Sequence, residues 1–189
     1  FPALHPSQKI DDNVKQRPRQ SEPSHMAGFV QYFLSAIGVV VLLLAGAVVS
    51  GLYILPVGKV VPIDFPNLAL TAKPNQYLVC PPDYCTAIAQ HPSPKYDIPV
   101  AELQRQWQQY LASEPGLSLI QDHPDGQQVT YVARSNLIGY PDLITLRFIE
   151  TGAQQSTLAI YSRSIYGYSD LGVNQNRIKE WVSSFSNQK

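Results

Sequence analysis

The stretch DLITLRFIETGAQQSTLAIYSRS, residues 142–164, decides the fold of this chain. In the runs 142–150 and 156–164, apolar side chains alternate with polar or smaller ones, which is the pattern of a strand with two different faces. The residues TGAQ between the two runs are typical of a turn. Because a connection this short can join only antiparallel neighbours, the stretch predicts a β-hairpin.

Two further strand-like runs, 117–121 and 127–135, precede this hairpin, and the segments HPDG and NLIGYP separate the runs. Apolar residues at helical spacing flank the four strands on both sides. We therefore predict an α+β domain over residues 76–189, with an antiparallel sheet of four to five strands and two helices packed on one face. The helical residues are Val100, Leu103, Trp107, Tyr110 and Leu111 before the strands, and Ile178, Trp181, Val182 and Phe185 after them.

The alternation assigns each strand residue to one of two faces. One face receives an arginine from each of three adjacent strands, namely Arg134, Arg147 and Arg163. Guanidinium groups suit phosphates and carboxylates, so this face is a candidate site for an anion or an acidic partner. The alternative is a solvated face on which the arginine stems lie along the sheet. The other face is apolar and should be covered by the helices; it carries Val129, Tyr131, Ala133, Ile144, Leu146, Phe148, Leu158 and Ile160.

The segment GYSDLGVNQNR, residues 167–177, leads from the last strand into the last predicted helix. Ser169 or Asp170 is placed to cap that helix, because a short oxygen-bearing side chain can accept hydrogen bonds from the N–H groups of the first turn. Asn174 and Arg177 lie about one turn apart and can face the same loop. Two interpretations explain these residues. They form a purely structural turn between the strand and the helix, or they bind a small anion at the start of the helix.

Three tyrosines near this corner, Tyr161, Tyr166 and Tyr168, have no role in such a cap. Neighbouring tyrosines are typical of protein contact surfaces. A partner contact is therefore the third interpretation of this region.

The run 161–177 resembles the C-terminal signature R-S-x-S-R-x-G-x-S-D-x-G-x-N-x-x-R of the family catalogued as domain of unknown function 1499. The two arginines of the first part of that signature are Tyr161 and Ile165 here, and an arginine stands between them at position 163. The resemblance covers about residues 76–187 and implies a stand-alone or membrane-tethered module without implying an activity. The matching residues are Ser162, Ser164, Gly167, Ser169, Asp170, Gly172, Asn174 and Arg177.

An apolar segment precedes the domain. Residues 26–58 contain no Asp, Glu, Lys or Arg, and the segment is long enough to cross a hydrocarbon core of about 30 Å. We predict a transmembrane helix over residues 26–56, preceded by a polar N-terminal arm (1–25) and followed by a proline-rich stalk (57–75). A cleaved signal peptide is the alternative.

The orientation follows from the flanking charges. Lys15, Arg17 and Arg19 precede the apolar segment, whereas Lys59 and Lys73 follow it. The excess of basic residues on the N-terminal side favours a cytoplasmic N-terminus. We therefore expect a single-pass membrane protein whose C-terminal domain is periplasmic or lumenal.

Cys80 and Cys85 in the segment CPPDYC bear on the same question. A disulfide between them would indicate an oxidising compartment. Two unlinked thiols are the alternative, because tight loops often cannot reach disulfide geometry.

The sequence contains neither a phosphate-binding loop nor a dinucleotide fingerprint, and no metal or cofactor is expected. GYSDLG is close to a nucleophile elbow, but no histidine follows Ser169. The formal net charge of zero argues against nucleic acid as a partner. We expect a non-enzymatic accessory or assembly subunit that contacts the lipid bilayer and an integral membrane partner. The alternatives are a tethered module that binds a small anion or lipid headgroup, and a hydrolase.

Overall fold

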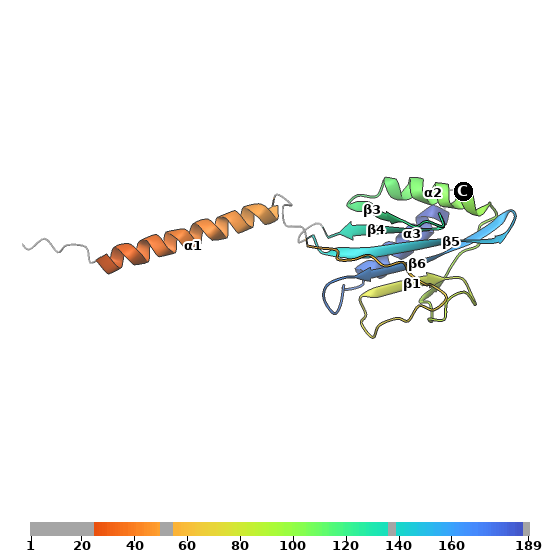
Figure 1. Cartoon of the computed structure of the whole chain (residues 1–189), viewed down its shortest axis with the longest axis horizontal. Coiled ribbons are helices and arrows are strands. Elements are labelled where there is room, and N and C mark those ends of the chain that lie inside the picture. Colours follow the sequence, from red (N-terminus) through yellow and green to blue (C-terminus); the bar gives the residue numbers. More distant parts are fainter. Residues whose placement is uncertain (1–24, 50–54, 136–138, 187–189) are drawn as a thin grey trace, which may run out of the picture. The chain divides into compact units, whose positions relative to one another are not determined.

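The structure, a computed structural model, describes residues 25–49, 55–135 and 139–186. The chain divides into two compact units, one ending at Ala45 and the other beginning at Gly46 (Figure 1). The predicted polar arm, residues 1–25, lies outside the described residues apart from His25.

Helix α1 (His25–Val49) forms the apolar segment. Its stretch Gly28–Ala47 has a mean hydropathy of 2.2 and is not buried in the protein. At 1.5 Å per residue, this stretch is long enough to cross a membrane, although signal sequences have the same character. The predicted end of the helix at residue 56 is too late, because α1 ends at Val49 and residues 55 and 56 are not helical. Apolar composition alone does not mark where a helix ends.

The second unit is built on a sheet with the strand order β2-β1-β6-β5-β4-β3. Each neighbouring pair from β3 to β6 is antiparallel, which confirms the four predicted strands and their hairpins. The strands are β1 (Gln76–Cys80), β2 (His91–Pro92), β3 (Leu117–Asp122), β4 (Gln128–Arg134), β5 (Pro141–Gly152) and β6 (Gln155–Ser164).

The sheet differs from the prediction at one edge, because it has six strands and is mixed. Strand β1 pairs antiparallel with β6 and parallel with β2. All five residues of β1 are buried, so its sequence shows no alternation of apolar and polar side chains. Strand β2 has only two residues and gives no pattern to detect.

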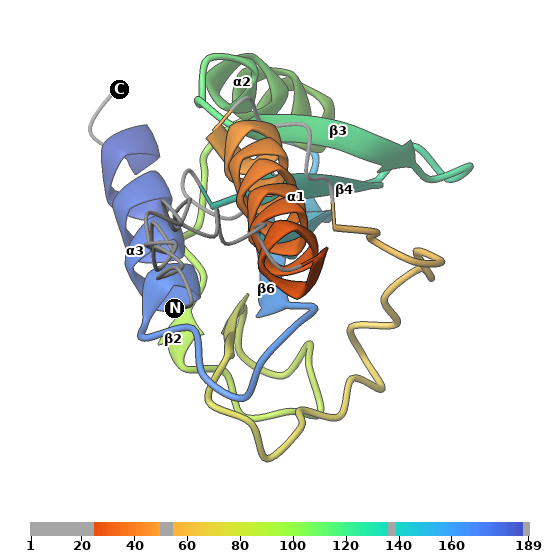
Figure 2. The same ribbon diagram turned by 90° about the vertical axis from the view of Figure 1, so that its left-hand side faces the viewer.

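Helices α2 (Val100–Ala112) and α3 (Val173–Ser186) confirm the two predicted helices (Figure 2). Both bury their apolar stripes against the sheet face that was predicted to be apolar. Trp107 of α2 stacks on Phe185 of α3, with ring centroids 4.4 Å apart. The indole N–H of Trp181 donates to Glu114 Oε2 at 3.0 Å, which ties α3 to the turn that follows α2. The two helices therefore share one core.

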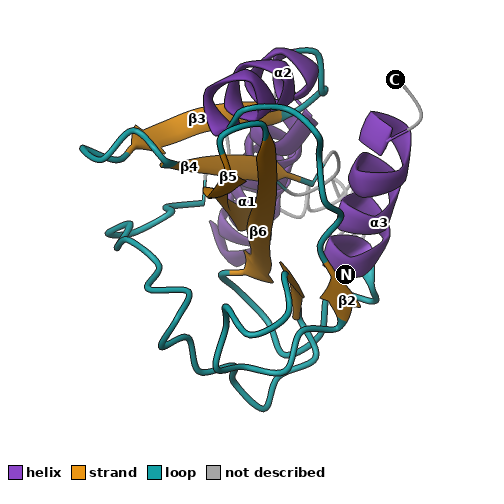
Figure 3. Cartoon of the chain, turned by 90° about the vertical axis from the view of Figure 1, so that its right-hand side faces the viewer, coloured by secondary structure: helices purple, strands orange, loops and turns teal. Residues whose placement is uncertain are grey.

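The opposite face of the sheet is covered rather than solvated. Residues from the segment 63–70 and from the loop 84–89 pack on it around Phe65, which is fully buried, together with Leu78 and Ala159 (Figure 3). Thus Thr130 and Thr145, which lie on the same face as the arginines, are buried. Part of the segment expected to be a stalk is a layer of the domain, because its apolar residues cover the second face.

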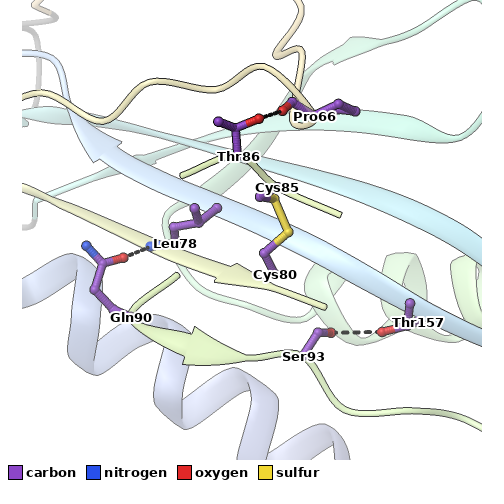
Figure 4. Close-up of a disulfide and its surroundings, with 8 residues drawn as sticks. All are labelled: Pro66, Leu78, Cys80, Cys85, Thr86, Gln90, Ser93 and Thr157. Atoms are coloured by element: carbon purple, nitrogen blue, oxygen red, sulfur yellow. Dashed lines mark hydrogen bonds between the residues drawn. A yellow bond between two sulfur atoms is a disulfide. The ribbon is translucent and has the colours of Figure 1, made fainter. Parts of the chain in front are cut away.

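The disulfide Cys80–Cys85 joins the end of β1 to this covering loop (Figure 4). The Cα atoms lie 6.3 Å apart, within the range that a disulfide spans. The adjacent hydroxyl of Thr86 donates to the carbonyl of Pro66, which connects the two covering segments. The disulfide therefore holds the cover of the second face to the sheet.

Candidate functional site

The signature residues meet at the corner where β6 passes into α3. Asn174, in the first turn of α3, is fully buried and lies at the centre of the corner. Its amide Nδ2 donates to Ser164 Oγ at 3.0 Å and to Asp170 Oδ2 at 2.7 Å. Its Oδ1 accepts from the hydroxyl of Ser162 and from Arg177 Nη1, the latter at 3.1 Å. One side chain thus connects the strand, the loop and the helix.

Asp142, at the start of β5, completes this network. Its Oδ2 accepts from Arg177 Nη2 at 2.9 Å, and its Oδ1 accepts from the hydroxyl of Ser164 at 2.5 Å. Asp142 was not among the site residues predicted from the sequence. The available signal was an aspartate directly before the apolar pair Leu143 and Ile144 of a predicted strand, where a buried carboxylate needs a cation and donors.

The loop before α3 is shaped by Asp170 and Ser169. The carboxylate of Asp170 accepts from the backbone N–H groups of Gly172 (3.1 Å) and Asn174 (2.8 Å), so it caps the start of α3. Ser169 Oγ accepts from the N–H of Leu171 at 3.2 Å. Leu171 has a φ of 56°, in the left-handed region that leucine rarely adopts.

A pocket of about 600 Å³ opens beside this corner. Its size falls within the range of small-molecule sites. The rings of Tyr140 and Tyr166 lie 6.3 Å apart on its wall. Its lining combines the polar corner with apolar and aromatic side chains: Leu55, Ser135, Tyr140, Asp142, Ser164, Tyr166, Gly167, Ser169, Asp170 and Val173.

The segment that begins at Leu55 is attached to the domain at this pocket. Arg134 Nη1 donates to the carbonyl of Leu55 at 3.0 Å, and Tyr166 Oη donates to the carbonyl of Pro56 at 2.8 Å. We call these two hydrogen bonds the clamp. In Figure 1 the β6–α3 loop and the start of this segment lie at the same end of the sheet. Two residues predicted as ligand or partner residues therefore bind the chain's own backbone.

The three arginines of the predicted anion face do not converge. Arg134 faces Pro141 across the ladder, and Arg163 faces Leu143, so these two share one end of the sheet. Arg147 lies about 13 Å further along β5 than the partner of Arg163, at 3.3 Å per residue. The arrangement gives no single anion cradle.

Arg147 also has local partners. It forms an ion pair with Asp125 and donates to Gln127 Oε1 at 3.2 Å. The hydrogen bond from Arg147 lowers the pKa of Asp125 below its ordinary value. Arg147 therefore holds the loop between β3 and β4.

The three tyrosines lie in different surroundings. Tyr161 is buried in the covered face and donates to Gln76 Oε1 at 2.7 Å, and burial raises its pKa. Tyr166 belongs to the clamp, whereas Tyr168 is 68% exposed. Only Tyr166 and Tyr168 are therefore available at the surface.

Within the described ranges, no group of three or more His, Cys, Asp or Glu side chains is arranged to hold a metal ion. His123 is buried beside Thr130 and Gln128, with its Nε2 3.5 Å from Thr130 Oγ1. His91 Nδ1 lies 2.7 Å from the carbonyl oxygen of Pro92. Each histidine thus makes its polar contacts with residues close to it in the sequence.

An apolar helix followed by a disulfide-bonded α+β domain is the arrangement typical of proteins that are anchored in a membrane or secreted. Residues 69–185 match the family described as protein of unknown function (DUF1499), and the chain belongs to that family. The match begins seven residues before the predicted start at Gln76, within the segment that packs on the sheet. No curated protein matches the chain.

Proposed function

We propose that this chain is a non-catalytic, single-pass membrane protein whose DUF1499 domain works at the membrane surface outside the cytoplasm, as an accessory or assembly subunit of a membrane complex. The clamp is the observation that carries this proposal. Because Arg134 and Tyr166 hold the backbone of residues 55 and 56, the segment that comes from α1 enters the domain at a defined place. This fixed entry supports a role in which the domain is held at a partner in the membrane.

Covalent geometry limits how far the domain can stand from the membrane. Six residue steps separate Val49, the end of α1, from Leu55. At about 3.5 Å per residue, these steps bridge at most roughly 20 Å. The clamp therefore stays near the surface of a membrane that α1 crosses, whatever the orientation of the domain.

The disulfide supports the location outside the cytoplasm. Cytosolic proteins rarely keep structural disulfides, because thiol reductants reduce them. Cys80 is buried in the core of the covered face, and Cys85 packs against the same core. Their bond therefore has a structural role.

The proposal is tested in two steps on the full chain in its own membranes. Carbonate washing and protease treatment of sealed vesicles should show an integral protein whose domain is digested only from the side opposite the cytoplasm. Gentle extraction followed by native mass spectrometry should then show the chain in an assembly with a constant stoichiometry. A chain released by carbonate, or one that is monomeric in every mild extract, would refute the corresponding part of the proposal.

A double replacement, Arg134→Ala with Tyr166→Phe, removes both hydrogen bonds of the clamp. It should reduce the fraction of assembled chain while the fold, measured by tryptophan emission, is kept. Arg105→Ala is the matched control, because Arg105 is an exposed arginine of α2 that pairs only within its own helix.

The pocket favours a second candidate function, a tethered module that binds a ligand. The carboxylates of Asp142 and Asp170 form part of the wall, so a hydroxylated or amphiphilic ligand fits better than a small anion. A stoichiometric small molecule that stays with the monomer in native mass spectrometry, and is lost in Ser164→Val, would support this candidate. If native mass spectrometry finds no bound small molecule, this second candidate function is refuted.

A further inference from the structure

We propose that five exposed side chains around the pocket lie in the lipid–water interface of the membrane. This inference rests on the proposed anchoring by α1. We call these residues the apolar rim: Tyr140, Tyr166, Tyr168, Leu171 and Val173.

The exposed apolar side chains of the domain are concentrated in this rim. Between residues 55 and 186, nine large hydrophobic side chains of the described residues are exposed, and five of them belong to the rim. Tyr140, Tyr166 and Val173 line one pocket, and Tyr168 and Leu171 are in the same loop as its residues Ser169 and Asp170. The others lie in different parts of the sequence: Val61, Ile88, Leu119 and Ile120.

Leu171 is the most informative member. It is 92% exposed and adopts a φ of 56°, so its backbone is strained and its side chain contributes little packing. A left-handed leucine costs about 1–2 kcal/mol, and glycine or asparagine would serve the turn better. A large apolar side chain at such a position is accounted for by an apolar environment outside the domain.

The clamp locates the rim. Leu55 and Tyr166 line the same pocket, and Tyr166 binds the backbone of Pro56. The rim is therefore next to the point where the segment from α1 enters the domain, within roughly 20 Å of chain from the end of that helix.

The chemistry of the rim fits the interface. Tyrosine is enriched at the boundary between hydrocarbon and water, where its ring is apolar and its hydroxyl remains hydrated. The carboxylates beside the rim are engaged, Asp142 by Arg177 and Asp170 by backbone N–H groups. Lys73 Nζ lies 3.5 Å from the carbonyl oxygen of Gly167, so a cation stands next to this loop and can meet anionic headgroups.

The test places a tryptophan probe in the full chain, reconstituted into vesicles of phosphatidylcholine and phosphatidylglycerol. Tyr168→Trp adds a probe in the rim, and Ala153→Trp adds a control at the exposed turn between β5 and β6. The turn lies ten residues along β5 from Asp142, about 34 Å away. The natural tryptophans, Trp107 and Trp181, are buried and give a constant background.

Brominated lipids quench a tryptophan that lies in the interface. We expect the added emission of Tyr168→Trp to be quenched several-fold more than that of Ala153→Trp, and to shift to shorter wavelength when the protein is moved from a mild detergent to vesicles. Leu171→Asn in the Tyr168→Trp background should reduce the quenching. If Tyr168→Trp does not fold, Leu171→Trp carries the same test.

Equal quenching of the rim and turn probes would overturn the inference. Carbonate resistance of the same vesicles distinguishes this result from a failure of anchoring. A protein that stays in washed vesicles while its rim probe is not quenched is anchored but does not place the rim in lipid. A protein that washes off refutes the anchoring on which the inference rests.

Discussion

Arg177 of α3 forms an ion pair with Asp142 of β5, with 2.9 Å between Nη2 and Oδ2. The side chains are only 18% and 10% exposed, so both charges have lost most of their water. Asn174 and Ser164 supply the remaining hydrogen bonds of the pair. The last helix is thus joined to the sheet by a buried polar network in addition to its apolar stripe.

Arg177→Met should lower the free energy of unfolding by about 3 kcal/mol, because it leaves the carboxylate of Asp142 buried without its cation. Urea unfolding of the full chain in detergent, followed by tryptophan emission, measures this change. Both tryptophans lie in the domain, so the signal reports its unfolding.

Arg105→Met is the control, because the Arg105–Glu102 pair is 61% and 35% exposed on the surface of α2. It should leave the midpoint unchanged. Adding Asp142→Leu to Arg177→Met should recover part of the loss, since neither charge is then buried alone. Equal losses in the Arg177 and Arg105 variants would show that the buried pair has no special role.

Replacing both cysteines, Cys80→Ala with Cys85→Ala, should cost about 2 kcal/mol, the chain-entropy contribution expected for so short a loop. The loss should appear as a lower urea midpoint. Ellman titration of the denatured, unreduced natural chain should find no free thiol, and two thiols would contradict the disulfide.

Leu171→Asn should raise the free energy of unfolding by about 1 kcal/mol, because asparagine tolerates the left-handed conformation that strains leucine. The measurement is again the urea midpoint in detergent. Ile88→Asn is the matched control, since Ile88 is 90% exposed but has no positive φ, and it should change little. A destabilised Leu171→Asn would show that the leucine packs within the domain.

We expect Tyr96 to make the domain sensitive to alkaline pH. Burial is the main cause that raises its pKa from 10.0 to about 12. The neutral phenol is favoured in the folded state, so its contribution is complete below pH 10 and is lost as the pH rises through about 12. The free energy of unfolding should fall in this window.

Tyr96→Phe keeps the edge-to-face contact with Phe185 and should make the decrease shallower. It should not abolish the decrease, because burial also raises the pKa of Tyr131 and Tyr161. An unchanged pH profile in Tyr96→Phe would assign the effect to other groups.

The antiparallel strands and both helices could be predicted because their residues alternate with period two or recur at helical spacing. The edge strands could not. Strand β1 is buried on both faces and β2 has two residues, so neither produces a pattern. The anion face of three arginines was predicted from the alternation alone. Alternation places residues on a shared face, but it does not give their distance apart along the strands or their local partners, such as Asp125 for Arg147.

The amino-acid sequence by itself determined the apolar helix, the order of α2, the four strands β3 to β6 and α3, the apolar face of the sheet and the signature residues, because each depends on neighbours within a few positions along the chain. Only the tertiary structure decided that Asp142 pairs with Arg177, that the segment around Phe65 covers the second face, and that Arg134 and Tyr166 hold residues 55 and 56. These contacts join residues 35 to 110 positions apart, or depend on which segment covers a face. Such pairings follow from the packing of the whole domain, which no local pattern in the sequence records.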